Sequence, residues 1–239
     1  MTTHTMRIAL ITGASRGLGL ALARQLALDG WILIITARGA EALETIRVDL
    51  APYTQVLAIA GDVADPAHRR ALAAAAAQVG GVDIVVNNAS VLGPSPQPAL
   101  LHYPLDALEQ VYRTNVIAPL GVLQAVQPHL KAGARILNIT SDAGVEAYSG
   151  WGGYGSSKAA LEHMSAMLAV ENPKLRVYWV DPGDMQTQMQ QDAFPGEDIS
   201  DRPLPEASVP GLVALISGDY PSGRYAARTL ATPIEGAEH

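Results

Sequence analysis

Cysteine is absent from the 239-residue chain, and this absence excludes several kinds of chemistry at once. Without cysteine there is no disulfide framework, no thiolate metal site and no cysteine nucleophile. Charged residues are also scarce, at 16%, whereas hydrophobic residues make up 49% of the sequence. This balance excludes an intrinsically disordered chain, and the length predicts a single domain, residues 1–239, that can bury a core.

Basic residues are outnumbered, because 16 lysines and arginines face 23 acidic residues and give a formal net charge of -7. Only three of the basic residues are lysines: Lys131, Lys158 and Lys174. A nucleic-acid backbone requires a basic surface, so we expect no nucleic-acid partner. No apolar run approaches the roughly 18 residues of a membrane span, and residues 1–7 lack the apolar segment of a signal peptide. We therefore expect no membrane association and a cytoplasmic location.

Short apolar runs alternate along the chain with longer stretches of helical period. The predicted strands are residues 7–12, 31–37, 55–60, 82–87, 134–140, 175–180 and 224–230. The predicted helices are residues 18–29, 40–51, 66–79, 105–130, 153–170 and 206–218, of which Pro119 and Pro128 should bend or divide the fourth. Strands this apolar are typical of a sheet with helices on both faces. The alternation predicts an α/β fold, a single-domain Rossmann-like doubly wound parallel sheet.

A glycine-rich segment, Thr12 to Gly19, connects the first predicted strand to the first predicted helix. Its glycines allow a tight turn and close approach of a ligand, and the helix that follows presents free N–H groups to a phosphate. The lysine followed by serine or threonine of a triphosphate-binding loop is missing from it. The segment indicates a dinucleotide site, with a plain strand-to-helix turn as the alternative.

The choice of dinucleotide depends on charge at the end of the second predicted strand. An NAD site usually places an acidic residue there, to accept a hydrogen bond from the ribose 2′-hydroxyl. This sequence has Arg38 instead, with no acid before Glu41, and Arg16 lies within the glycine-rich segment. Two guanidinium groups can bind a 2′-phosphate, so the pattern favours NADP(H). The alternative is that these arginines only cover the surface.

Tyr154 and Lys158 lie four residues apart at the start of a predicted helix, which places both side chains on one face. A neighbouring cation lowers the pKa of a phenol, so Tyr154 could exchange a proton with a substrate oxygen. The alternative is two residues on a solvated helix start.

The histidines show no metal-ligand spacing, and we expect no metal site; they include His68, His102, His129 and His163. A hydrolase built on Ser141 and His163 is disfavoured, because Ser141 lacks the G-x-S-x-G context of a nucleophile elbow.

Several motifs occur in an order that resembles the short-chain dehydrogenase/reductase family, over about residues 6 to 190. They are Thr12 to Gly19, Asp62-Val63, Asn87-Asn88-Ala89, Asn115, Ser141, Tyr154 with Lys158, and Asp181-Pro182-Gly183 followed by Thr187. The resemblance implies that residues 6–90 mainly bind the cofactor and residues 91–239 form the catalytic half, with a substrate lid at about 184–205. It implies an NADPH-dependent reductase that transfers hydride to a ketone or aldehyde, and a homo-oligomer, either dimer or tetramer.

The resemblance also implies roles for individual residues. Tyr154 would be the general acid, Lys158 would lower its pKa and hold the nicotinamide ribose, Ser141 would bind the carbonyl oxygen, and Asn115 would hold a water next to Lys158. The implied cofactor-binding residues are Gly13, Ser15, Arg16, Gly17, Leu18, Gly19, Arg38, Asp62, Val63, Asn88, Ala89, Tyr154, Lys158, Pro182, Gly183 and Thr187.

Three positions depart from the family pattern. Ser90 replaces the last glycine of N-N-A-G, Asp181 stands before Pro-Gly where a neutral residue is commoner, and residues 223–230 lack the usual glycine-rich ending. Substrate choice should come from residues 91–98, from residues 142–151 and from the lid. Their acidic and aromatic residues fit either a polar substrate with a ring or apolar portion, or a pocket whose acids face water. A non-catalytic NADP(H)-binding sensor or scaffold and a pterin-type reductase remain the alternative functions.

Overall fold

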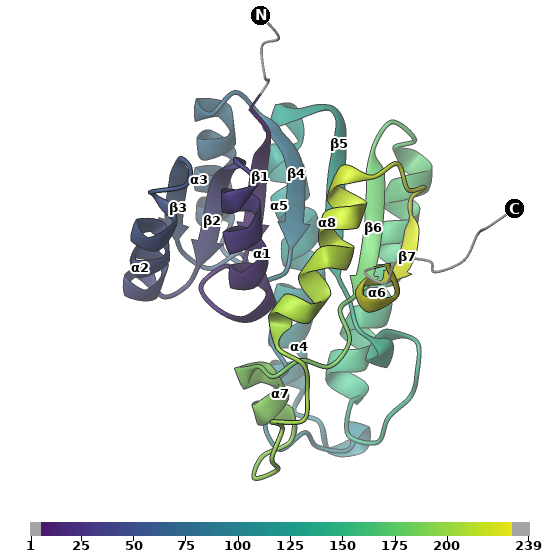
Figure 1. The fold of residues 1–239 in the computed structure, drawn as a ribbon. Coiled ribbons are helices and arrows are strands. Elements are labelled where there is room, and N and C mark those ends of the chain that lie inside the picture. Colours follow the sequence, from purple (N-terminus) through teal and green to yellow (C-terminus); the bar gives the residue numbers. More distant parts are fainter. Residues whose placement is uncertain (1–5, 231–239) are drawn as a thin grey trace, which may run out of the picture.

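The strands of the protein form one parallel sheet in the order β3-β2-β1-β4-β5-β6-β7, in a computed structural model that describes residues 6–230 (Figure 1). The strands are β1 (Ile8–Thr12), β2 (Ile32–Ala37), β3 (Val56–Ala60), β4 (Val82–Asn87), β5 (Leu130–Ile139), β6 (Arg176–Asp181) and β7 (Gly223–Ala226). Every residue of β1 is buried, as expected of a strand with helices above and below it. The doubly wound parallel sheet predicted from the sequence is confirmed.

Most of the helices form two layers, one on each face of the sheet (Figure 1). They are α1 (Gly17–Leu28), α2 (Ala40–Leu50), α3 (Pro66–Gln78), α4 (Leu105–Tyr112), α5 (Ala118–Val126), α6 (Gly152–Glu171), α7 (Gln188–Ala193), α8 (Val209–Ser217) and α9 (Ala227–Leu230). One apolar cluster packs α1, α2 and α8 against the sheet, and a second packs α3, α5 and α6 against the opposite face (Figure 1). Because successive side chains of a strand point to opposite faces, Ala9 belongs to the first cluster and Leu10 to the second.

The order of the strands reverses at β1, which pairs with β2 on one side and β4 on the other. In open parallel sheets, ligands bind beyond the carboxyl ends of the strands at this switch point. Figure 1 shows the short helix α7 beyond those ends and apart from the two helical layers. The sheet topology therefore places the glycine-rich segment after β1 at the expected ligand-binding edge.

Two predicted elements differ from the structure. Residues 105–130 form α4 and α5 joined by one π-helical turn, Arg113–Ile117, and Pro119 lies in the first turn of α5. The helix continues past this proline because the π turn has already changed the backbone register. Residues 224–230 were predicted as a strand, which is wrong: β7 ends at Ala226, where Thr229 Oγ1 donates to the Ala226 carbonyl oxygen and α9 begins.

Candidate active site

The glycine-rich turn after β1 needs glycine at three positions for two different reasons. Gly13 and Gly17 have φ angles of 67° and 56°, in the left-handed region that other residues rarely adopt. A Cβ atom on Gly19 would lie 2.4 Å from the Gly13 carbonyl oxygen, so a side chain there would push α1 away from the turn. Gly19 therefore packs the helix against the turn and does not itself line the cleft.

Two side chains hold this turn against the end of β4. Thr12 Oγ1 accepts hydrogen bonds from the backbone N–H groups of Asn88 and Ala89, both at 3.0 Å. The Asn88 side-chain amide donates to the carbonyl oxygens of Thr12, at 2.9 Å, and Gly13, at 3.1 Å. The Asn88 amide nitrogen is thus engaged in fixing the turn, and its contribution to ligand binding is to shape the cleft wall.

A cleft of about 720 Å³ extends from this turn along the carboxyl edge of the sheet. Its walls include most of the residues identified from the sequence: Gly13, Ser15, Arg16, Gly17, Leu18, Arg38, Asp62, Val63, Asn88, Ala89, Tyr154, Lys158, Pro182 and Thr187. Ser141 and Gly183 line a smaller adjoining cavity of about 80 Å³, together with Tyr154 and Thr187. One continuous edge therefore joins the predicted cofactor-binding residues to the predicted catalytic residues.

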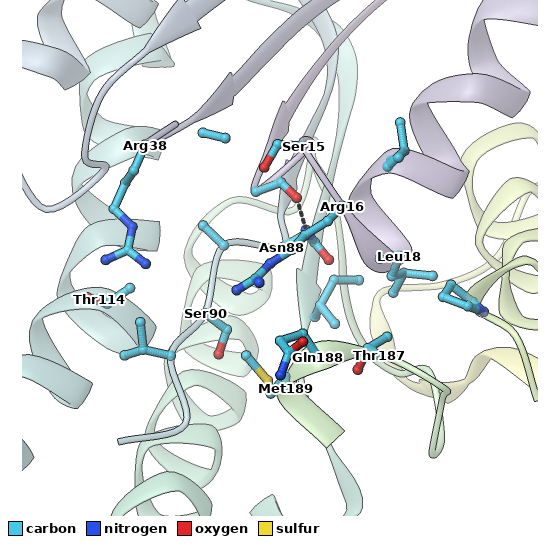
Figure 2. A pocket seen from close by; sticks show the side chains of 18 of the residues that line it. Ser15, Arg16, Leu18, Arg38, Asn88, Ser90, Thr114, Thr187, Gln188 and Met189 are labelled. Atoms are coloured by element: carbon cyan, nitrogen blue, oxygen red, sulfur yellow. Dashed lines mark hydrogen bonds between the residues drawn. The ribbon is translucent and has the colours of Figure 1, made fainter. Parts of the chain in front are cut away.

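One end of the cleft carries free positive charge. Arg16 and Arg38 are both exposed, and neither forms an ion pair with another residue between positions 6 and 230. Figure 2 shows both guanidinium groups projecting from the same side of the pocket, Arg16 from the glycine-rich turn and Arg38 from the end of β2. Such a pair of unpartnered forks is suited to binding a phosphate group.

The other end of the cleft is buried and holds Tyr154 and Lys158, which are 7% and 2% exposed. Lys158 Nζ donates to the Ile139 carbonyl oxygen at 2.8 Å and lies 5.3 Å from the centre of the Tyr154 ring. Burial lowers the pKa of Lys158 to about 8, and the Glu162 carboxylate opposes this shift. Burial raises the pKa of Tyr154, with the hydroxyls of Ser90 and Ser141 opposing.

The direction of the Tyr154 shift corrects one expectation from the sequence. The i, i+4 spacing predicted that Lys158 would lower the pKa of the phenol, but in this structure burial of the phenol raises its pKa, and the Asp181 and Asp142 carboxylates act in the same direction. The Lys158 ammonium is bonded to the backbone of β5, and it faces the Tyr154 ring at 5.3 Å. Tyr154 therefore keeps its proton across the neutral pH range, which suits a proton donor.

Ser141 begins the short 3-10 turn Asp142–Gly144 that follows β5. Its hydroxyl donates to Asp142 Oδ1 at 2.8 Å and accepts from the Ala143 N–H at 3.2 Å. To donate to a substrate oxygen, the hydroxyl must exchange its bond to Asp142. The structure brings Ser141 and Tyr154 to the same small cavity although 13 positions separate them in the chain.

Asn115 lies in the π-helical turn between α4 and α5, and its side chain is fully engaged by the protein. The amide donates to the Val91 carbonyl at 2.9 Å and to Ser157 Oγ at 3.0 Å. The amide oxygen accepts from the Val91 N–H at 2.9 Å and from Ser90 Oγ at 3.1 Å. The side chain of Asn115 therefore fixes the loop after β4 against α6, and its predicted role of holding a water stays a prediction.

The walls of the small cavity come largely from loops and from residues 184–193, which belong to the segment predicted as a lid. Its apolar side consists of Leu92, Trp151, Met189 and Ala193, and its acidic side of Asp142, Asp181 and Asp184. The Trp151 ring lies 5.8 Å from the Tyr154 ring and 5.9 Å from that of Phe194. Ser95 Oγ donates to the Asp192 carbonyl at 2.6 Å and joins the loop after β4 to α7.

Some residues at the site were not assigned a role from the sequence. Ser90 was noted only as a departure from the family pattern, yet its hydroxyl bonds to Asn115 and lies at Tyr154. Glu162 and Arg224 contact the backbone and side chains next to Ser141, from elements far apart in the chain. Thr36 and Gly61 also line the cleft. Thr36 lies near the end of the strand predicted at residues 31–37 and Gly61 directly follows the one predicted at residues 55–60, and these positions were the available signal.

A family model described as short chain dehydrogenase matches residues 7–198. The chain belongs to the short-chain dehydrogenase family, and is thus an oxidoreductase. The chain is 37% identical to the rhamnolipids biosynthesis 3-oxoacyl-[acyl-carrier-protein] reductase of Pseudomonas aeruginosa over 193 residues, which cover 77% of this chain and 74% of that protein. Sepiapterin reductase of Mus musculus is 30% identical over 199 residues, covering 77% of this chain and 76% of that one. A short chain dehydrogenase from Shigella flexneri, solved in complex with NADP, has a TM-score of 0.87 at 28% identity, covering 93% of this chain and 97% of that one.

Residues 6–230 show neither a membrane-spanning helix nor a metal site. No helix in this part of the chain has the length and apolar character needed to cross a bilayer. The histidines, aspartates and glutamates of the same residues form no group of three or more that could hold a metal ion. His68 is buried, with Nε2 2.7 Å from Thr36 Oγ1, and burial lowers its pKa.

Proposed function

We propose that this short-chain dehydrogenase is an NADP(H)-dependent reductase of small-molecule ketones or aldehydes. The observation that carries the proposal is the division of one cleft into two ends. Exposed Arg16 and Arg38 lie at one end, and buried Tyr154 and Lys158 lie at the other, next to Ser141. The first end suits a phosphorylated dinucleotide and the second suits proton transfer to a carbonyl oxygen.

The residues present fit the cofactor. Gly13 and Gly17 leave a cradle without side chains at the turn, and the N–H groups at the start of α1 would bind the pyrophosphate. Arg16 and Arg38 would bind the 2′-phosphate, Asp62 and Val63 would contact the adenine, and Lys158 would hold the nicotinamide ribose. Pro182, Gly183 and Thr187 would position the carboxamide. The Shigella flexneri relative, which has NADP bound, supports this assignment.

When bound, the reduced cofactor supplies a hydride to the carbonyl carbon. Ser141 Oγ donates a hydrogen bond to the carbonyl oxygen and stabilises the charge that develops on it. Tyr154 gives its phenolic proton to that oxygen, so that the ketone, the hydride and the proton become the alcohol. The Lys158 ammonium stabilises the phenolate that remains. The raised pKa of Tyr154 keeps the proton in place until the substrate oxygen takes it.

The size and lining of the small cavity suggest which carbonyl compounds fit. Leu92, Trp151 and Met189 offer an apolar and aromatic wall, so a substrate with a ring or an alkyl portion next to the carbonyl suits it. A cavity of about 80 Å³ favours small molecules, or larger ones that displace the lid.

The test is a screen for NADPH oxidation across ketones, aldehydes, quinones and pterins, with NADH measured alongside. Reduction of one or more carbonyl compounds with NADPH preferred supports the proposal. Tight NADPH binding without oxidation by any carbonyl compound would instead favour a non-catalytic sensor or scaffold. Pterins belong in the panel because sepiapterin reductase is among the similar proteins, and exclusive use of a pterin would favour a pterin-type reductase.

Homo-oligomer formation and a cytoplasmic location also stay predictions. Exposed apolar side chains on packed helices support the first: Leu105 on α4, Ile117 on the π turn and Val170 on α6 are 74%, 57% and 78% exposed. Light scattering coupled to gel filtration tests it, with a Val170→Asp variant expected to shift the protein toward the monomer if these helices form the interface.

A further inference from the structure

Arg224, on the edge strand β7, contacts three groups that lie behind the reacting end of the cleft. Its Nε donates to the two carboxylate oxygens of Glu162, at 3.0 and 3.2 Å. One terminal nitrogen, Nη2, donates to the Ser141 carbonyl oxygen at 3.3 Å and lies 3.6 Å from Asp181 Oδ2. The side chains of Glu162 and Asp181 are only 11% and 15% exposed, so these charges are largely removed from water.

The fold brings these residues together from four elements. Ser141 follows β5, Asp181 ends β6, Arg224 lies in β7, and these three strands are neighbours in the sheet. Glu162 lies on α6 one helical turn after Lys158, so both side chains are on the same face of the helix. Glu162 Oε1 also accepts from Thr140 Oγ1 at 2.8 Å. A single guanidinium thus connects the backbone of Ser141 to the helix that carries Lys158.

The positive charge of the Arg224 guanidinium also compensates the negative charges of two largely buried carboxylates, Glu162 and Asp181. Burial raises the pKa of Asp181 and Arg224 opposes that shift, while the Gly183 N–H bonds Asp181 Oδ1 at 2.8 Å. A buried carboxylate left without its cation carries a large desolvation penalty. Loss of Arg224 would therefore leave two uncompensated carboxylates next to the reacting groups.

We propose that Arg224 is a positioning residue, which holds the Ser141 backbone and the Glu162 carboxylate in fixed relation to Tyr154 and Lys158. This inference rests on the proposed reductase function. Arg224 is not among the residues lining the cleft or the small cavity, so it acts through Ser141 and Glu162 and touches neither substrate nor cofactor.

A consequence for proton transfer follows from the charges around Lys158. The charged or titratable groups around the Tyr154–Lys158 pair are Glu162 on α6, which acts on Lys158, and Asp181 on β6 and Asp142 after β5, which act on Tyr154, with Arg224 on β7 next to Glu162 and Asp181. Glu162 raises the pKa of Lys158, and Arg224 offsets the Glu162 charge. Removing the guanidinium strengthens the field of Glu162 on Lys158. The pKa of Lys158 should then rise, and the alkaline limb of the kcat profile should move to higher pH.

The experiment compares Arg224→Gln, Arg224→Lys and the double variant Glu162→Gln/Arg224→Gln in the full chain. The control is Arg176→Gln, which removes the same charge from the opposite end of β6, where Arg176 pairs with the exposed Asp219 at 3.3 Å. Melting temperature, the Kd of NADPH, KM and kcat for one ketone, and the pH profile of kcat are measured for each variant. Arg224→Gln should lower kcat by about 10²-fold with KM nearly unchanged, and move the alkaline limb up by about one unit.

Each further variant separates a part of the proposal. Arg224→Lys keeps the positive charge but loses the planar guanidinium that contacts both Glu162 and the Ser141 carbonyl. It should therefore lower kcat while leaving the alkaline limb of the kcat profile at the wild-type pH. The double variant should return the limb toward the wild-type position without restoring kcat, because the Ser141 carbonyl still lacks its donor. Arg224→Lys with wild-type kcat, or Arg224→Gln indistinguishable from Arg176→Gln, would overturn the proposal.

A titration of the protein without cofactor keeps this inference separate from the proposed function. In a Lys131→Arg/Lys174→Arg background, Lys158 is the only lysine of the chain, and its Nζ or Cε signal gives its pKa by NMR. Arg224→Gln should raise that pKa, and an unchanged value would contradict the inferred coupling. If the wild-type protein reduces no carbonyl compound, the proposed function fails, and a shifted Lys158 titration would then show only the charge coupling.

Discussion

The two ends of the cleft hold their charges in opposite ways. Arg16 and Arg38 at the phosphate end are exposed and form no ion pair with residues 6–230. Tyr154 and Lys158 at the reacting end are buried, and burial moves the pKa of both. The first end can attract a ligand through charge that salt screens, whereas the second sets the proton affinity of its groups by excluding water.

Tyr154→Phe has the largest expected effect, because it removes the proposed proton donor at the buried end and leaves the ring packed against Trp151. We expect kcat to fall by about 10³-fold, with the Kd of NADPH within about twofold of the wild type. Steady-state absorbance and a fluorescence titration measure the two quantities. The control is Tyr53→Phe, at a tyrosine that is 58% exposed and outside the cleft. A Tyr154→Phe protein that keeps more than about a tenth of the wild-type kcat would rule out this role.

Arg38→Asp tests the exposed end of the cleft. A carboxylate there repels a 2′-phosphate and can accept from a 2′-hydroxyl, so kcat/KM for NADPH should fall by about 10²-fold while that for NADH is kept or rises. The loss of kcat/KM for NADPH relative to the wild type should become smaller at high salt, because salt screens exposed charges. Arg24→Asp, on the exposed face of α1 and away from the cleft, is the matched control. An equal loss of kcat/KM with NADPH and with NADH would show that Arg38 does not bind the 2′-phosphate.

Lys158→Met tests whether burial sets the proton affinity at the reacting end. The pKa of Lys158 is lowered from 10.5 to about 8, so holding its ammonium in the fold destabilises the protein below pH 8. This cost is relieved as the pH rises from about 8 toward 10.5, because the folded protein releases the proton first. The stability of the wild type relative to the variant should therefore increase by about 2 to 3 kcal/mol between pH 7 and pH 10.

Urea unfolding at the two pH values measures this difference. Lys174→Met, at an exposed lysine, should show no comparable change. Parallel pH dependence of the wild type and Lys158→Met would mean that Lys158 has an ordinary pKa in the folded protein.

The smallest expected effect concerns two buried tyrosines with different partners. Tyr178 donates its hydroxyl to the Tyr220 carbonyl at 3.0 Å, whereas the Tyr103 hydroxyl has no hydrogen-bond partner among residues 6–230. Tyr178→Phe should cost about 1 kcal/mol of unfolding free energy, and Tyr103→Phe should change it by less than about 0.5 kcal/mol. Chemical unfolding of both variants measures which one loses more unfolding free energy. A larger loss for Tyr103→Phe than for Tyr178→Phe would show that the Tyr103 hydroxyl has a hydrogen-bond partner.

The arrangement of residues at the exposed end of the cleft follows more directly from the sequence than that at the buried end. Glycines at positions 13, 17 and 19 and an arginine after β2 have consequences that follow from local backbone rules and from charge alone. The packing at the buried end depends on which strand ends lie next to each other. Arg224 reaches Ser141 only because β7 follows β6 in the sheet, and no spacing within the chain encodes that contact.

The pKa of Tyr154 is a second property that the sequence alone does not predict. Its spacing from Lys158 is visible in the sequence, but the loss of water around both groups is a property of the folded protein, and it reverses the direction expected for the phenol. The strand predicted at residues 224–230 was wrong beyond Ala226 for a related reason, since the turn into α9 depends on a hydrogen bond from Thr229.

The most direct measurement is the ratio of kcat/KM for NADPH to that for NADH, in the reduction of one ketone by the wild-type protein. A high ratio requires that a cofactor bound by Arg16 and Arg38 at the phosphate end also reaches Tyr154 and Lys158 at the reacting end. A joined site of the proposed kind should give a ratio of about 10² or more, through the charge-assisted binding of a 2′-phosphate. A ratio at or below one, or no oxidation of either cofactor by any carbonyl compound, would contradict an NADP(H)-dependent carbonyl reductase.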